Sequence, residues 1–286
     1  MPPDTGLVLA RFAALALLLA LAGIPLYLRI AGQVVASRAL CIGLAVLAAG
    51  SALASLWWAA ASVAAMAAMP LAGLDREILF AVLSATPLGD VLIVRLAVAA
   101  CLLIALALTA RTLPAALIAF PALASSAWTG HAGATEGMIG TAHRAMDVVH
   151  LGAAAVWLGA LCVFVMTHFG AGVRRQFVER LSAFARTGTV VVIALAVTGL
   201  ANALLITRNG WSATSGWSLL LAVKICFFLA MLGFAALNRW RLAPAFERGT
   251  PGAARRLGLS LTLETASAFS IVLLVAVFGM LDPSGG

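Results

Sequence analysis

Charge is the scarcest property of this sequence. Only 10% of its 286 residues are Asp, Glu, Lys or Arg, and 64% are hydrophobic, whereas an average soluble domain is about a quarter charged. The mean hydropathy is +1.11. These values exclude an ordinary soluble domain and predict an all-α polytopic membrane protein, because its length is taken up by apolar runs.

Lysine and cysteine are also rare, and each scarcity excludes a class of function. The single lysine is Lys224, so arginines carry nearly all of the net charge of +8. They fall mostly in short loops, where they orient the chain and meet lipid headgroups, and no basic patch with interleaved aromatics indicates a nucleic-acid partner. The four cysteines lie inside apolar runs without a CxxC pair, which argues against a disulfide framework or a zinc knuckle. No ATP-binding loop is recognisable, which excludes a primary pump unless a partner supplies the motor. We also expect that the protein is not an enzyme.

Eight runs are long enough, or nearly so, to cross a bilayer as helices, the open-ended structure that satisfies backbone groups in lipid. They are residues 7–28, 39–60, 91–110, 112–128, 145–167, 187–207, 217–237 and 258–281. Loops after odd-numbered runs hold twelve arginines and loops after even-numbered runs hold three. The positive-inside rule therefore places both termini outside, which is the periplasm if the protein lies in a bacterial inner membrane.

Residues 61–90 are too apolar for an ordinary loop and are interrupted by Pro70 and by the charged run from Asp75 to Glu77. We predict an interfacial or re-entrant helix on the outer surface for this segment. The expected organisation is thus residues 1–85, holding two spans and this outer segment, followed by a six-span region over residues 86–286.

Three ionisable residues mark the mouth of the fifth span. His143, Asp147 and His150 fall within about 60° of one another on a helix, and Trp157 continues the same stripe inward. The two histidines are about 10 Å apart along the axis, too far for one metal ion with ligands at about 2 Å. Three interpretations stay open: one site completed from elsewhere, two sites in series, or Asp147 orienting a histidine.

Further ligands are available near this outer end. The preceding loop offers His131, Glu136 and Met138, Met146 lies beside the stripe, and an MxxM pair stands in the outer segment at Met66 and Met69. Imidazole with thioether ligands favours copper, whereas imidazole with carboxylate also accepts zinc and other divalent ions. Each methionine is equally compatible with simple packing.

Four polar residues lie where lipid or apolar packing is expected, namely Arg95, Asn202, Lys224 and Glu264. An isolated ammonium at that depth needs an acidic or carbonyl partner or a water-filled cavity. Counting from the ends of the spans leaves about 10 Å of depth between Lys224 and Glu264. Asp147 is therefore the better partner by depth, in either a functional or a structural ion pair.

The pattern H-x3-D-x2-H-x6-W-x-G-x-L, from His143 to Leu161, resembles the signature of the CopD family (PcoD/CopD-like) of bacterial inner-membrane copper-resistance proteins. TPLGDVLIVR (86–95), TGHA (129–132), TGLAN (198–202) and residues 219–244 resemble other motifs of that family in the same order. The resemblance covers residues 86–283.

The resemblance implies a multi-pass inner-membrane protein that handles copper, commonly moving it towards the cytoplasm beside a periplasmic CopC-like protein. It makes candidate copper-site residues of His150, His143, His131 and Asp147. It also implies framework or pathway roles for six further side chains, which are Arg95, Trp157, Asn202, Lys224, Asn238 and Glu264.

Two other functions are compatible with the same residues. A haem b electron-transfer protein or metal reductase would use two facing imidazoles, such as His131 with His150 or with His143. A membrane receptor would hold copper for a partner and transport nothing. The copper oxidation state is open in each case.

Overall fold

The structure is a computed structural model, and it describes residues 4–168, 174–208 and 210–284. Over these residues the chain is helical and contains no strand, only one isolated bridge between Val35 and Arg111. The elements in chain order are α1 (Thr5–Ile30), α2 (Arg38–Met66), η1 (Leu71–Gly73), α3 (Arg76–Ala85), α4 (Pro87–Leu108), α5 (Thr112–Ala124), η2 (Ser125–Trp128), α6 (Gly130–Ala134), α7 (Gly137–His168), α8 (Arg174–Thr207), α9 (Gly216–Leu237), η3 (Asn238–Leu242), α10 (Ala243–Glu247) and α11 (Ala253–Phe278).

The all-helical prediction is confirmed, and the number of spans is close to the predicted eight. In the part of the chain that the structure describes, seven helices are long and apolar enough to cross a membrane. The predicted span 112–128 is also an apolar helical segment, formed by α5 and the 3-10 turn η2 together, but it is shorter than the other seven. The chain is therefore a multi-pass membrane protein.

Local signals set where several helices begin. Asp4 accepts a hydrogen bond from the Gly6 amide at the start of α1, and Ser37 and Ser215 cap α2 and α9 in the same way. Such side chains satisfy amide groups that lack a partner in the first turn. Pro87 opens α4, where its missing N–H costs nothing.

Two helices begin earlier than hydropathy predicts. The prediction started the fifth span at residue 145 and the sixth at residue 187, but α7 begins at Gly137 and α8 at Arg174. The loop expected before His143 is thus largely helical, since it forms η2, α6 and the first turns of α7. Hydropathy marks the apolar part of a helix, whereas a helix continues through polar residues as long as its backbone bonds are made.

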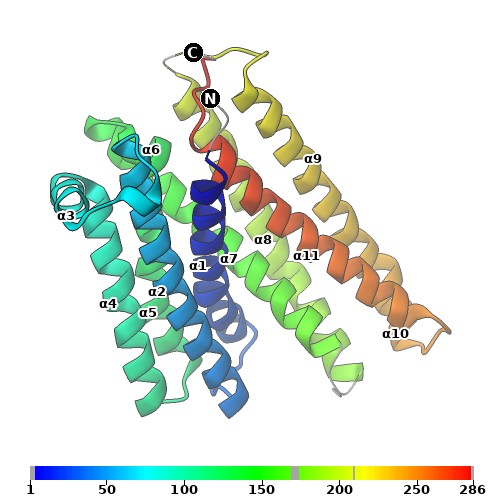
Figure 1. Ribbon diagram of the computed structural model, residues 1–286. Helices are drawn as coiled ribbons and strands as arrows, with labels where there is room; N and C mark the ends of the chain where they lie inside the picture. Colours follow the sequence, from blue (N-terminus) through cyan, green and yellow to red (C-terminus); the bar gives the residue numbers. More distant parts are fainter. Residues whose placement is uncertain (1–3, 169–173, 209, 285–286) are drawn as a thin grey trace.

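The segment after α2 forms a short exposed helix outside the long spans. The 3-10 turn η1 is followed by α3, which Asp75 caps through the Ile78 amide. This helix lies at the edge of the bundle, at the end that carries both termini (Figure 1). The two termini therefore share one side, as predicted, and the arginine distribution predicts that this side faces the periplasm.

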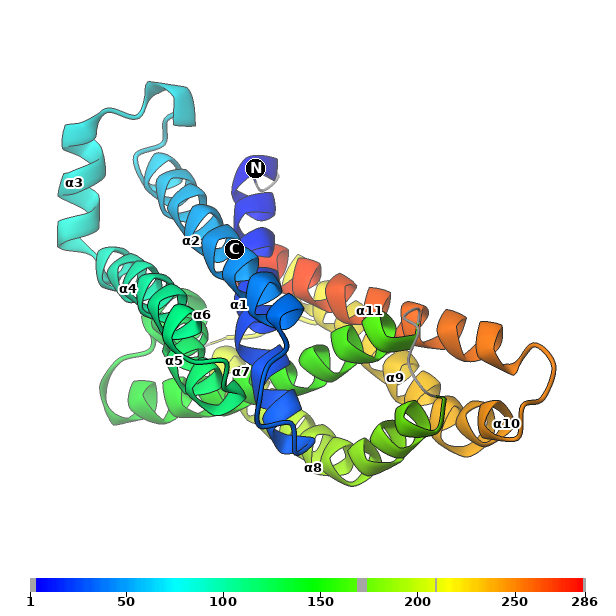
Figure 2. The same ribbon diagram turned by 90° about the horizontal axis from the view of Figure 1, so that it is seen from below.

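Helix α1 stands in the middle of the bundle. It packs against α2, α5, α7 and α11, with α2, α4 and α5 on one side of it and α8, α9 and α11 on the other (Figures 1 and 2). Its crossing with α7 depends on two glycines: a Cβ on Gly23 would lie 2.0 Å from the Ala155 carbonyl oxygen, and one on Gly159 would lie 2.2 Å from the Gly23 backbone. Small residues of this kind let helix backbones approach closely in membranes.

Candidate functional site

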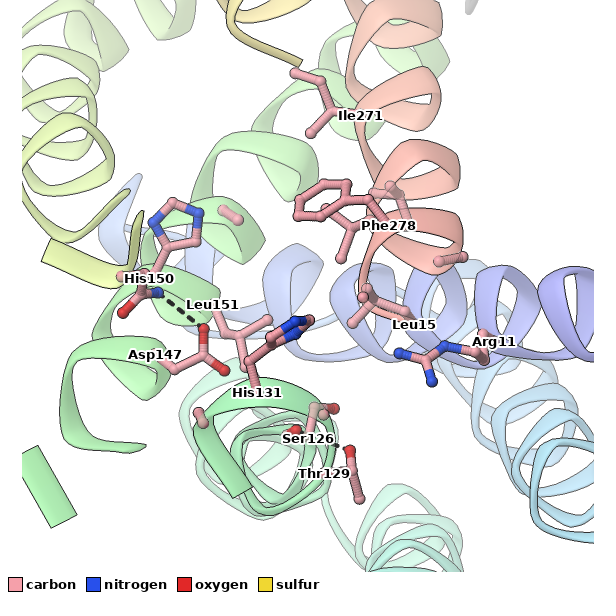
Figure 3. Close-up of a pocket in the computed structure, with 18 of the residues that line it drawn as sticks. Arg11, Leu15, Ser126, Thr129, His131, Asp147, His150, Leu151, Ile271 and Phe278 are labelled. Atoms are coloured by element: carbon pink, nitrogen blue, oxygen red, sulfur yellow. Dashed lines mark hydrogen bonds between the residues drawn. The ribbon is translucent and has the colours of Figure 1, made fainter. Parts of the chain in front are cut away.

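A cavity of about 240 Å³, which we call the outer cavity, is lined by Arg11 near the start of α1 and by Gly279 just after α11. It therefore lies at the end of the bundle that carries the termini (Figure 1). Its lining includes four of the predicted metal-site residues, His131, His143, Asp147 and His150. Helices α1, α4, α7, α8, α9 and α11 all contribute to the wall. Figure 3 shows His131 between Asp147 and His150 on one side and Arg11 on the other. The outer half of the bundle therefore collects ionisable groups from spans that are far apart in sequence.

The ring of His150 is held by helix α8. Its Nδ1 lies 2.9 Å from Thr198 Oγ1, and the same hydroxyl donates to the Ala194 carbonyl at 2.5 Å. Since a carbonyl only accepts, the Thr198 proton is already committed and the hydroxyl oxygen must accept from His150 Nδ1–H. The neutral ring then carries its lone pair on Nε2. Gly199 leaves room for this ring, because a Cβ there would lie 3.4 Å from His150 Cε1.

His143 is oriented by a similar chain of donors. Its Nδ1 lies 3.0 Å from Thr135 Oγ1, and Thr135 donates its own proton to the His131 carbonyl at 2.9 Å. Thr135 therefore accepts from His143 Nδ1–H, which leaves the lone pair of that buried ring on Nε2.

The His131 ring is fixed from the opposite end of the chain. Its Nε2 donates to the Leu281 carbonyl at 3.2 Å, which leaves the lone pair on Nδ1. His131 lies on α6, in the connection between two spans. Its burial lowers its pKa below the ordinary value, and the smaller effects of the Leu281 hydrogen bond and of the Asp282 charge raise it only in part. The ring is therefore neutral at pH 7, the form that binds metal ions.

Asp147 shares the cavity with the only lysine of the chain. Its Oδ1 accepts from Asn202 Nδ2 at 3.0 Å, and its charge interacts with that of Lys224. The Lys224 ammonium also lies 5.5 Å from the centre of the Phe278 ring. Asn202 Oδ1 is buried and has no hydrogen-bond partner among the described residues. This orphaned acceptor at a polar cavity suits a water, an ammonium or a metal-bound water.

A second polar cluster lies deeper in the bundle. Glu264 is only 3% exposed, and it accepts from Trp157 Nε1 at 3.2 Å and from Asn238 Nδ2 at 3.0 Å. These three framework residues therefore meet one another rather than Lys224. Asn238 Oδ1 stays buried without a partner.

An apolar cavity of about 410 Å³ adjoins the outer one between α7, α8, α9 and α11. The two cavities share His150 and Lys224, and Trp157 and Met231 line the deeper one.

Arg95 and Arg11 complete the polar wall of the outer cavity. Arg95 is 5% exposed and bonds to Ser125 and Ser126. Sequence reasoning identified Arg95 but missed Arg11, which lies in a span that carries no other charge between Thr5 and Leu28. That isolation inside an apolar run was the available signal, since ionisable residues there tend to be functional.

The five additional ligand candidates lie outside this cavity. Met138 is 91% exposed and Met66 is 60% exposed, and neither Met69 nor Met146 is among the lining residues. Glu136 lies at the surface in a separate shallow pocket that His131 also borders.

The predicted metal-site residues do not form a closed metal centre in the described part of the chain. Across residues 4–168, 174–208 and 210–284, no three His, Cys, Asp or Glu side chains gather closely enough to hold one ion. Separate imidazole lone pairs instead line one polar cavity, next to a carboxylate. Imidazole suits copper as well as zinc, nickel and iron, so the donor set alone does not choose the metal.

Comparison with known proteins identifies the family. Residues 1–141 match the family model "Copper resistance protein D-like, N-terminal domain", and residues 178–278 match "Copper resistance protein D". Thus the first two spans, which carry no recognisable motif, also belong to a matched region. His143, Asp147 and His150 lie between the two matched regions. No solved structure matches.

Two curated relatives agree with this assignment. The chain is 35% identical over 215 residues to "Copper resistance protein D" of Pseudomonas syringae pv. tomato, covering 69% of each chain. It is 30% identical over 159 residues to "Inner membrane protein YebZ" of Escherichia coli K12, covering 55% of each. This multi-pass membrane protein belongs to the copper resistance protein D family.

Proposed function

We propose that the protein moves copper ions through the bacterial inner membrane, from the periplasm towards the cytoplasm, and that copper enters at the outer cavity. Copper is the substrate here and not a resident cofactor. A relative named as an inner-membrane protein and the arginine distribution support this location and orientation. A periplasmic CopC-like protein would be a suitable donor at the open end.

The observation that carries the proposal is the state of the three imidazoles. Each of His131, His143 and His150 has one ring nitrogen committed to a hydrogen bond, and the other is left with a lone pair. Metal-binding histidines are commonly held in this way, because the bond fixes the tautomer and the ring orientation. Three prepared donors along one cavity would replace the water of an entering copper ion in steps.

The groups beyond the imidazoles would assist in different ways. Asp147, oriented by Asn202, would offset the positive charge of the ion. His150 borders both cavities and is the natural point of transfer inward. The deeper cavity is apolar, so passage would follow the copper gradient or be coupled to protons on Asp147, Glu264 or a histidine.

The first experiment is elemental analysis and a visible spectrum of protein purified without chelator. Wild type is compared with His150→Ala and, as a matched control, with His168→Ala, which lies at the other end of α7, about 27 Å away. We expect about one copper per chain and no Soret band, with loss of copper only in His150→Ala. Weak binding would be measured by copper titration of the same samples.

Copper uptake into sealed vesicles then tests transport itself. Uptake by wild type that is lost in His150→Ala supports the proposal. A Soret band that disappears in His150→Ala would refute it and make the protein a cytochrome. Stoichiometric copper binding without uptake would make it a copper receptor instead.

A further inference from the structure

The outer cavity carries an excess of positive charge. Arg11, Arg95 and Lys224 line it, whereas Asp147 is the one carboxylate among its lining residues. None of these three cations makes an ion pair within 4.0 Å in the described chain. The charges of Asp147 and Lys224 interact across the cavity, so the two arginines are left without a counter-charge.

Arg95 is held in place without being neutralised. Its Nε donates to Ser125 Oγ at 3.3 Å and one terminal nitrogen donates to Ser126 Oγ at 2.9 Å, while the guanidinium lies 4.3 Å from the centre of the Trp58 ring. Ser125 passes its own proton to the Ala122 carbonyl, so it acts here only as an acceptor. Three of the five N–H groups of this guanidinium remain free to donate.

The positive charge of Arg11 has even fewer polar partners than that of Arg95 among the described residues. It makes no hydrogen bond within the described residues, and its guanidinium lies against the backbone at Gly279, where a Cβ would be 2.9 Å away. It is close enough to Arg95 for the two positive charges to repel each other. Guanidinium groups stay charged in proteins and bind anions through several donors at once. Two such groups facing one cavity within a membrane protein favour a negative charge between them.

We infer that the outer cavity binds a small anion, of the size of chloride, between the guanidinium groups of Arg11 and Arg95. The Ser126 hydroxyl, which accepts from Arg95 and also lines the cavity, is placed to donate to the same anion. If copper is the substrate, as proposed above, it enters together with this anion, because a bare cation would add to three positive charges that face one carboxylate.

The test is equilibrium binding of radiolabelled chloride to the full-length protein in nanodiscs of zwitterionic lipid. The variants are Arg11→Gln, Arg95→Lys and, as a matched control, Arg76→Gln, which removes an exposed arginine on α3 at the same end of the bundle. Arg11→Gln removes no protein hydrogen bond, so we expect it to fold. Chloride should bind wild type and Arg76→Gln saturably, and its affinity should fall at least about tenfold in Arg11→Gln, as for the loss of charge-assisted bonds.

Several outcomes would overturn the inference. One is that wild type shows no saturable chloride binding, and another is that Arg11→Gln and Arg76→Gln bind chloride equally. A third is that anionic lipid in the nanodisc abolishes chloride binding, which would show that the arginines bind a lipid headgroup instead. Weakened binding by Arg95→Lys, which keeps the charge but not the fork of donors, would support it. Copper titration in chloride-containing buffer separates the two proposals. Arg11→Gln leaves every imidazole in place, so chloride binding by wild type without copper binding would refute copper transport alone.

Discussion

Replacing Thr198 by valine tests the assignment of the His150 tautomer. Valine keeps the shape of threonine but removes the oxygen that accepts from His150 Nδ1–H at 2.9 Å. A buried donor left without its partner costs roughly 1–3 kcal/mol. If that cost falls on the copper-bound state, copper affinity drops by about 5- to 150-fold. Loss of a group that orients a metal ligand typically has an effect of this size.

The assay is competition for copper against a chromophoric chelator, with wild type, Thr198→Val and two controls. Thr189→Val removes a hydroxyl on the same helix that also bonds back to its own backbone, at Ala185, but lies at the exposed surface. Thr198→Ser retains the acceptor. We expect only Thr198→Val to lose affinity. Equal affinities for Thr198→Val and Thr189→Val would show that His150 does not depend on α8 for its orientation.

Three further predictions concern stability and pH. Gly159→Ala should lower the unfolding temperature through a loss of about 1–3 kcal/mol of stability, because the new Cβ must move from 2.2 Å to at least 3.4 Å from backbone atoms. Gly233→Ala should not lower it, because no atom lies within 4 Å of the Cβ position there. Equal losses of stability in the two variants would contradict the packing argument. Glu264→Ala leaves two buried donors unpaired and should destabilise by roughly 2–6 kcal/mol, measured by thermal unfolding, whereas Glu264→Gln keeps an acceptor and should lose less. Burial lowers the pKa of His131, so at this residue the unfolded chain takes up a proton below about pH 6.5 more readily than the folded chain does. The free energy of unfolding of metal-free protein should therefore fall as the pH falls from 7.5 to 5.5. This fall should be smaller in His131→Gln.

The sequence predicted those parts of the fold that depend on local composition. Apolar runs gave the positions of the spans, and the helical repeat placed His143, Asp147 and His150 on one stripe. The depth of Lys224 also favoured Asp147 over Glu264 as its partner, and the structure brings Lys224 and Asp147 to the same cavity. Each of these inferences needs only the chain itself and the helical rise.

Contacts between distant spans could not be predicted in the same way. The acceptor role of Thr198 depends on how α8 packs against α7, and a threonine inside a span commonly bonds to its own backbone without further consequence. Arg11 belongs to the cavity only because α1 lies at the centre of the bundle. The roles of the histidines as copper ligands stay predictions, as does the division of the chain at residue 85.

The central position of α1 has a consequence for biosynthesis. It precedes the other described helices in the chain, yet α7 and α11, two of the helices that surround it, are completed more than 130 and 240 residues later. Until then Arg11 stands in an incomplete bundle, with neither the Gly279 backbone beside it nor the full cavity wall around it. Assembly of the outer cavity is therefore a late event, and a nascent chain that lacks α11 has the imidazoles but not the complete cavity wall.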